Sequence, residues 1–272
     1  CDGQTVADLI HVHIHIITAA GLETVGQSVI LFQLLFRGSV DHLTFQQYLE
    51  RLDACRENNI SADFIISPHY FPSTLYTDYP EMHHPQGLMV KYRYDNPIAR
   101  EVLTEYIEML MNSLLPYQDV IGSITLAHEP SQLAHQSGDY YKPHFEKYLT
   151  ELYNGNLAEM NRIYGTDYKS FAEVPFTPGT KPSPQLFDYI NFNDSIGTDF
   201  IKFLHDEVAK YTDKPVNTKI MHWIGNSDAG AAEKRWLLGV GADPEKLAPY
   251  SDIMGNDSEL DARVPFSGEF EE

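Results

Sequence analysis

The feature that most constrains the fold is the alternation of short apolar segments with amphipathic helical segments. Six apolar segments predict β-strands, at residues 9–17, 28–36, 62–69, 120–129, 215–223 and 251–257. Apolar side chains recur at helical spacing in 41–58, 95–115, 143–164 and 186–211, so these ranges predict helices. Strands that alternate with helices indicate βαβ units and a parallel sheet. The near-continuous apolar strands favour a sheet covered on both faces.

Local residues mark where these elements begin and end. Asp95 or Asn96 is expected to cap the helix at 95–115, with Pro97 in its first turn, and Gly165 to close the helix at 143–164. The Pro-rich segment 174–185 predicts a long loop. No repeat, low-complexity tract or linker divides the chain, so a single domain over residues 1–272 is expected.

Polar and aromatic residues follow four of the predicted strands at their carboxyl ends. These residues are His69, His128 with Glu129, His222 with Trp223, and Asn256 with Asp257. In parallel α/β folds the functional groups gather at this edge of the sheet. The recurrence predicts a functional site there, although each residue taken alone also fits an ordinary loop.

The charge and the motif content exclude several functions. Asp and Glu outnumber Lys and Arg by 39 to 19, which disfavours nucleic acid and anionic membranes as partners. No apolar run reaches the ~20 residues of a membrane span. No P-loop, G-x-G-x-x-G or G-x-S-x-G motif supports nucleotide binding or serine hydrolysis. Two cysteines do not form a disulfide framework, and the sequence leaves secreted and cytoplasmic locations open.

Glu129 is the strongest candidate for chemistry. A glycosidase needs two carboxylates, one that protonates the leaving oxygen and one that attacks the sugar or activates water. Glu129 ends the fourth predicted strand, and Tyr140, Tyr141 and Trp223 supply aromatic rings of the kind that stack on sugars. These residues indicate a carbohydrate substrate and a reaction without metal or cofactor.

Two segments resemble a known family. "SITLAHEP" and "HFEKYLTELYNGNLAEMNRIYGTDYKSFAEV" are similar to clan A glycoside hydrolases, in particular the β-galactosidases of family 42. The matching positions are Phe145, Tyr148, Leu149, Tyr153, Leu157, Asn161, Tyr164, Gly165 and Thr166. The resemblance implies a (β/α)₈ TIM barrel, retaining hydrolysis of β-glycosides such as β-galactosides or β-glucans, and an acid/base role for Glu129.

The sequence departs from that family in two places. His128 stands where the family has an Asn that binds the sugar, and a neutral imidazole can also donate one hydrogen bond. The family's nucleophile ends the seventh strand, whereas the sixth predicted strand ends at Asp257 and Glu269 is the nearby candidate. We therefore expect a barrel that is incomplete at its C-terminal end or completed by another chain, as in a homo-oligomer. His69, His128, His222, Trp223 and Asn256 are expected to bind substrate.

Two alternatives remain open. In "HVHIHI", His11, His13 and His15 lie on one side of a strand, as in the metal site of amidohydrolase-type barrels. His69, His128, His222 and Asp257 could complete such a zinc site, but the fourth strand has no lysine at its end to bridge two metals. The second alternative is a barrel that binds sugar without hydrolysing it.

Overall fold

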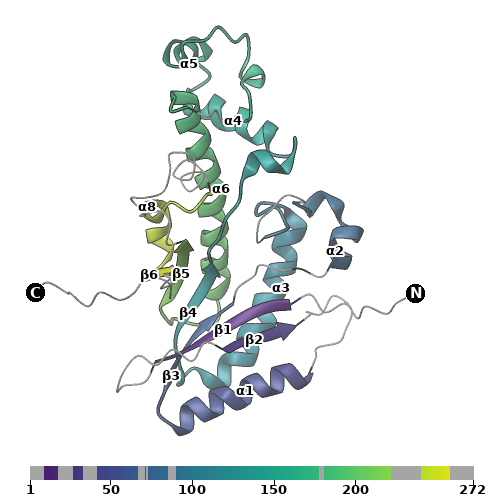
Figure 1. The fold of residues 1–272 in the computed structure, drawn as a ribbon, viewed down its shortest axis with the longest axis vertical. Helices are drawn as coiled ribbons and strands as arrows, with labels where there is room; N and C mark the ends of the chain where they lie inside the picture. The colour runs from purple at the N-terminus through teal and green to yellow at the C-terminus, as the bar shows by residue number, and fades with distance from the viewer. Residues whose placement is uncertain are drawn as a thin grey trace, which may run out of the picture.

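The structure is a computed structural model that describes residues 9–17, 27–32, 42–66, 71, 73–84, 90–177, 181–221 and 240–257. These residues contain six strands, which form one sheet in the order β2–β1–β3–β4–β5–β6 (Figure 1). The strands are β1 (Leu9–Ile17), β2 (Gln27–Phe32), β3 (Ser61–Ile65), β4 (Ile121–His128), β5 (Val216–Met221) and β6 (Ile253–Asp257). Each predicted strand is therefore present, and the observed strands end earlier at four of the six predicted positions.

The strand directions differ in part from the prediction. Strands β3, β4, β5 and β6 are parallel, as expected, whereas β1 is antiparallel to both β2 and β3. The prediction of an all-parallel sheet is thus wrong for β1. Only residues 18–26 separate β1 from β2, fewer than the dozen or more that a parallel crossover needs. Antiparallel pairing is the arrangement that this short connection allows.

Three of the four predicted helices are single helices, and the other is divided. The α-helices are α1 (His42–Glu57), α2 (Ser73–Asp78), α3 (Pro97–Leu114), α4 (Lys142–Leu152), α5 (Leu157–Tyr164), α6 (Pro184–Val208) and α8 (Pro244–Leu247). Short 3₁₀ turns are η1 (Pro80–Met82), η2 (Leu115–Tyr117), η3 (Ala134–Ser137), η4 (Phe171–Glu173) and η6 (Ala248–Tyr250). The helix predicted over 143–164 breaks because Asn154 and Gly155 have left-handed φ angles of 50° and 72°.

The long helices begin close to the positions that the sequence predicts, and they pack against the sheet. The Asn96 side chain accepts hydrogen bonds from the Ile98 and Ala99 amides, which makes Asn96 the cap of α3. Figure 1 shows α3 and α6 running beside each other along the sheet. Between them the rings of Tyr94 and Phe200 stack at 4.0 Å. None of the described helices is both long enough and apolar enough to cross a bilayer.

Helices α4 and α5 form a lobe at one end of α6, at the top of Figure 1. Asp188 on α6 is buried and accepts hydrogen bonds from the hydroxyls of Tyr153 and Tyr164, at 2.6 and 2.7 Å. Gly165 closes α5 in the left-handed conformation, with φ of 68°. The residues that carry the family resemblance in this segment therefore fasten the lobe to α6.

Candidate active site

Glu129 directly follows β4, the strand that lies between β3 and β5. Its amide donates to the Lys219 carbonyl on β5 at 2.7 Å, which extends the β4–β5 ladder one residue beyond the strand. Its φ is 49°, in the left-handed region that few residues other than glycine adopt. Such strained positions gather at functional sites, where the surrounding structure enforces them. The backbone thus holds Glu129 in one unusual conformation at the carboxyl end of the sheet.

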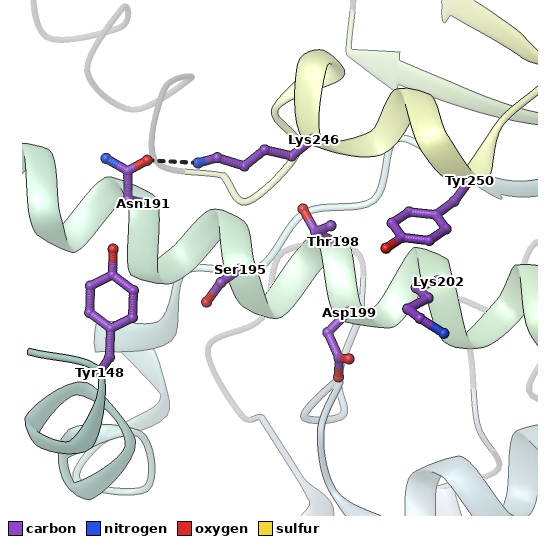
Figure 2. Close-up of a pocket in the computed structure, with 8 residues that line it drawn as sticks. All are labelled: Tyr148, Asn191, Ser195, Thr198, Asp199, Lys202, Lys246 and Tyr250. Carbon is purple, nitrogen blue, oxygen red and sulfur yellow. Dashed lines mark hydrogen bonds between the residues drawn. The ribbon is translucent and has the colours of Figure 1, made fainter. Parts of the chain in front are cut away.

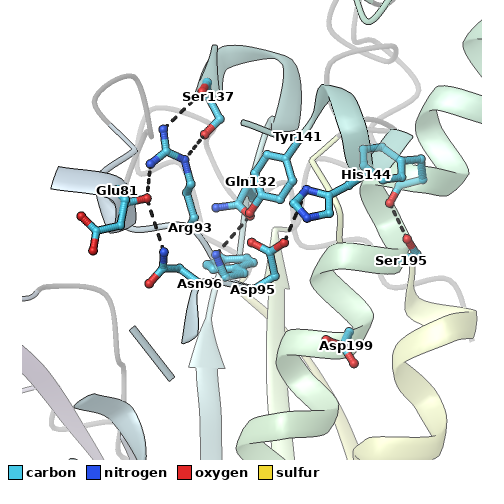
Figure 3. A network of polar contacts seen from close by, with 12 residues as sticks. Glu81, Arg93, Asp95, Asn96, Gln132, Ser137, Tyr141, His144, Ser195 and Asp199 are labelled. Atoms are coloured by element: carbon cyan, nitrogen blue, oxygen red, sulfur yellow. Dashed lines mark hydrogen bonds and ion pairs between the residues drawn. The ribbon is translucent and has the colours of Figure 1, made fainter. Parts of the chain in front are cut away.

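The segment after Glu129 is fixed by the buried side chain of Gln132. Its Nε2 donates to the Tyr92 carbonyl at 3.1 Å. Its Oε1 accepts from the Tyr141 hydroxyl at 2.8 Å, and Figure 3 shows these two side chains next to each other. The Gln132 amide donates to the Val240 carbonyl at 2.8 Å. One residue therefore ties the segment that follows β4 to residues on either side of it.

Asn193 of α6 holds the same segment from the other side. The Asn193 side chain is fully buried; its Nδ2 donates to the Gln132 carbonyl at 2.5 Å and its Oδ1 accepts from the Ala134 amide at 2.8 Å. Helix α6 also touches the chain before α8, because a Cβ on Gly197 would collide with the Gly241 carbonyl oxygen. Only glycine fits at position 197, so this contact sets the distance between α6 and residue 241.

Two residues before α3 complete the attachment. The Tyr94 hydroxyl donates to the Ser131 carbonyl at 3.2 Å and accepts from the Ser131 amide at 3.0 Å. Arg93 donates from Nε to the Ser137 hydroxyl at 2.7 Å, as Figure 3 shows, and lies over the Tyr140 ring. We refer to Arg93, Tyr94, Gln132 and Asn193 as the loop clamp. The loop clamp makes residues 131–137 a rigid support for Glu129.

A buried histidine lies against the same loop. The His84 side chain is fully buried, and its Nε2 is 3.4 Å from the Leu133 carbonyl oxygen. Burial lowers the pKa of His84 to about 4. His84 is therefore neutral beside the loop clamp across the physiological pH range.

Hydrogen bonds between polar side chains also connect β3, β4 and β5. Asp63 on β3 accepts from the hydroxyls of Ser123 and Thr125 on β4, at 2.6 and 3.0 Å. The Thr125 hydroxyl accepts from Asn217 Nδ2 on β5 at 3.2 Å. This chain of hydrogen bonds crosses three parallel strands and fixes how β4 lies between its neighbours.

The structure places some of the predicted site residues and leaves others outside the described residues. His128 is half-buried and pairs with Lys219, and Met221 pairs with Asp257, so the ends of β4, β5 and β6 lie at one edge of the sheet. Asn256 lies at this edge through its backbone, on β6. His69, His222, Trp223 and Glu269 are outside the described residues.

The zinc alternative stays a prediction. Among the side chains that the structure describes, no group of three or more His, Cys, Asp or Glu could hold a metal ion. Strand β1, which carries His11, His13 and His15, has a described backbone, and His15 lies opposite Asp63 in the antiparallel register. An H-x-H strand that runs against β3–β6 differs from the parallel first strand on which that alternative depends.

The loop clamp is absent from the sequence-based predictions. Asn193 lies in the buried stripe of α6 next to Phe192 and Ile196, so a polar residue within an apolar stripe was the available indication. Gln132 and Tyr94 carry no comparable pattern, because Gln132 Nε2 and the Tyr94 hydroxyl donate to backbone carbonyls about 40 residues away in the sequence.

Comparison with known proteins identifies the family and the fold of the chain. The family described as "Beta-galactosidase", glycoside hydrolase family 42, matches residues 40–258. No curated protein matches the chain. Among solved structures, an exo-carrageenase of family 42 from Bacteroides ovatus is 25% identical, with a TM-score of 0.56 over 71% of this chain and 27% of that chain.

Two further structures show the fold alone. The β-galactosidase from Rahnella sp. R3 is 18% identical, with a TM-score of 0.62 over 82% of this chain and 32% of that one. The catalytic domain of the β-amylase from Paenibacillus polymyxa is 15% identical, with a TM-score of 0.61 over 80% of this chain and 65% of that one.

These similarities confirm an α/β fold of the TIM-barrel type, over part of the barrel. The chain spans about a third of the length of the exo-carrageenase and β-galactosidase structures that it matches. The family match extends over well more than half of the 272 residues. The chain belongs to family 42 of the glycoside hydrolases.

Proposed function

We propose that the chain supplies the acid/base part of a retaining β-glycosidase that acts on β-galactosides, with Glu129 as the catalytic acid/base. The observation that carries the proposal is the placement of Glu129: it follows the central parallel strand β4 in a left-handed conformation and is backed by the loop clamp. The family match, whose description is "Beta-galactosidase", supports this substrate class.

The chemistry follows from two carboxyl groups with different tasks. Glu129 donates its proton to the glycosidic oxygen as the bond to the leaving group breaks. A second carboxylate attacks the anomeric carbon, and Glu129 then takes a proton from the water that releases the sugar. We propose Glu269 as that nucleophile. His128, beside Glu129, is proposed to donate a hydrogen bond to the sugar, with His69, His222, Trp223 and Asn256 as further binding residues.

The test compares wild type with Glu129→Gln on two aryl β-galactosides, one with a good and one with a poor leaving group. General acid catalysis contributes roughly 10²–10⁴-fold, so the variant should lose that much on the poor leaving group and less on the good one. Glu151→Gln is the matched control, because the Glu151 side chain is 68% exposed on α4, away from the site.

Azide tests whether hydrolysis proceeds with retention. In Glu129→Ala, azide should restore turnover and yield a β-galactosyl azide, because it attacks a covalent intermediate without needing a base. Equal activity of wild type and Glu129→Gln on both substrates would remove Glu129 from catalysis. Galactoside binding without turnover in the wild type would favour the sugar-binding alternative. Loss of activity on chelation, restored by zinc, would favour the metal alternative.

A further inference from the structure

The outer face of α6 carries a groove whose lining residues include neither Glu129 nor any residue of the loop clamp (Figure 2). Its volume is about 380 Å³, within the range of about 300–1,000 Å³ that is usual for ligand pockets. Its floor is a stripe of polar α6 residues at helical spacing: Asn191, Ser195, Thr198, Asp199 and Lys202. The side chains of Ile196, Phe200 and Leu204 are buried and face the core, so this stripe lies on the other side of the helix. We call it the outer groove.

Two tyrosines stand at the ends of the outer groove. Tyr148 comes from α4 and Tyr250 from η6, and both rings are partly exposed. The Tyr250 ring packs against the His205 ring, with 6.1 Å between the ring centroids, and the Lys202 Nζ lies 5.9 Å from the Tyr250 ring centroid. Tyrosine rings offer a flat apolar face next to a polar hydroxyl. A ligand that fits here has apolar faces and many hydroxyl groups.

The charged groups of the outer groove are already compensated. Lys246 pairs with Asp194 at 3.1 Å and donates to Asn191 at 2.8 Å, as Figure 2 shows for the second contact. Asp199 pairs with Arg100 at 2.5 Å, and Lys202 pairs with Asp206. With a formal charge of −20 on the whole chain, an anion gains little by entering. The outer groove therefore suits an uncharged ligand.

One hydroxyl in the outer groove has no partner among the described residues. Thr198 Oγ1 is buried and makes no hydrogen bond within this part of the chain, whereas the neighbouring Ser195 hydroxyl donates to the Phe192 carbonyl at 2.6 Å. A threonine within a helix can bond to the carbonyl one turn earlier, and Thr198 does not. Because a buried unpaired polar group costs about 1–3 kcal/mol, this hydroxyl favours a ligand that would pair with it.

We propose that the outer groove is a second carbohydrate-binding site, which takes an uncharged oligosaccharide that stacks on Tyr250 and bonds to Thr198. The choice of a carbohydrate rests on the proposed function, whereas the location rests on the groove itself. The site would hold a longer substrate on the surface of α6 while another part of the sugar chain reaches the edge with Glu129.

The test is isothermal titration of β-1,4-galactotetraose into the Glu129→Gln protein, which turns over too slowly to consume the probe. Two binding events are expected. Adding Tyr250→Ala should weaken one of them at least tenfold, and adding Thr198→Val should weaken the same event several-fold. Tyr79→Ala is the matched control, because Tyr79 is another exposed tyrosine and lies outside the groove. It should change neither event.

Thr198→Val also guards against a purely structural effect. Valine has the shape of threonine and removes only the unpaired hydroxyl, so the melting temperature should stay equal or rise while binding weakens. Binding that is unchanged in both Tyr250→Ala and Thr198→Val would overturn the site, as would a single binding event in the Glu129→Gln protein that does not depend on Tyr250. If hydrolysis is absent and binding still depends on Tyr250, the proposed function fails and the outer groove stands.

Discussion

The loop clamp and the outer groove use the same helix in opposite ways. On one side of α6, Asn193 uses both ends of its side chain to bind the loop that follows Glu129. On the other side, the Thr198 hydroxyl is unpaired among the described residues, and the ion pairs around it are partly exposed. Rigid support requires saturated hydrogen bonds, whereas binding requires groups that are still available. The number of available polar groups therefore distinguishes a support from a binding surface.

The difference between the two sides of α6 should have its largest effect on stability, and Asn193→Ala compared with Ser195→Ala tests it. The first variant leaves the Ala134 amide and the Gln132 carbonyl buried without their partner, which should lower the free energy of unfolding by about 4 kcal/mol. Ser195→Ala should change it by no more than about 0.5 kcal/mol. Urea unfolding of the two variants measures both values. Equal losses would mean that the two sides of α6 are not different in kind.

A smaller effect concerns Asp194, which lies between the two regions. Burial raises the pKa of Asp194 to about 6, and Lys246 only partly opposes this. Because the folded chain holds this proton more tightly than the unfolded chain, stability falls as pH rises from about 4 to about 6. With the ordinary aspartate pKa of 3.8 for the unfolded chain, the loss amounts to about 3 kcal/mol. Asp194→Asn should remove it.

Urea unfolding at intervals between pH 4 and pH 7 measures this dependence. His84 acts in the opposite direction over the same window, because its lowered pKa makes the protein lose stability as pH falls from about 6.5 to about 4. The difference between wild type and Asp194→Asn cancels the His84 contribution. Asp167→Asn is the control, since that side chain is 99% exposed. A difference that does not vary with pH would contradict the assigned burial effect.

The smallest effect concerns the backbone of Glu129. A left-handed residue other than glycine costs roughly 1–2 kcal/mol, so Glu129→Gly should raise the free energy of unfolding by about 1 kcal/mol while removing the proposed acid. The control Glu101→Gly, on the exposed side of α3, should lower it by about 1 kcal/mol. Thermal unfolding measures whether each of the two variants gains or loses stability. A loss of stability in Glu129→Gly would show that the conformation is not strained.

The sequence was sufficient to predict the positions of most elements and the place of Glu129 at the end of β4, whereas the catalytic role of Glu129 stays a prediction. Apolar runs and helical spacing located all six strands, the cap at Asn96 and the end at Gly165. Strand direction was not predictable from periodicity, because an apolar strand reads the same in either direction. The break at Asn154 and Gly155 was overlooked, although Asn-Gly is a recognised turn signal. The loop clamp depends on tertiary contacts that no local pattern encodes.

The Asp188 contacts have a consequence for the order of folding. Pairing of β4 with β5 joins Thr125 and Asn217, which are 92 residues apart, whereas Tyr164 and Tyr153 reach Asp188 over 24 and 35 residues. If the lobe forms first, its contacts shorten the flexible chain that must close into a loop when β4 pairs with β5. Since each halving of a flexible loop lowers its closure cost by about 0.6 kcal/mol, the lobe should speed the search of β4 for β5. Residues that identify the family would then also help its central strands to meet.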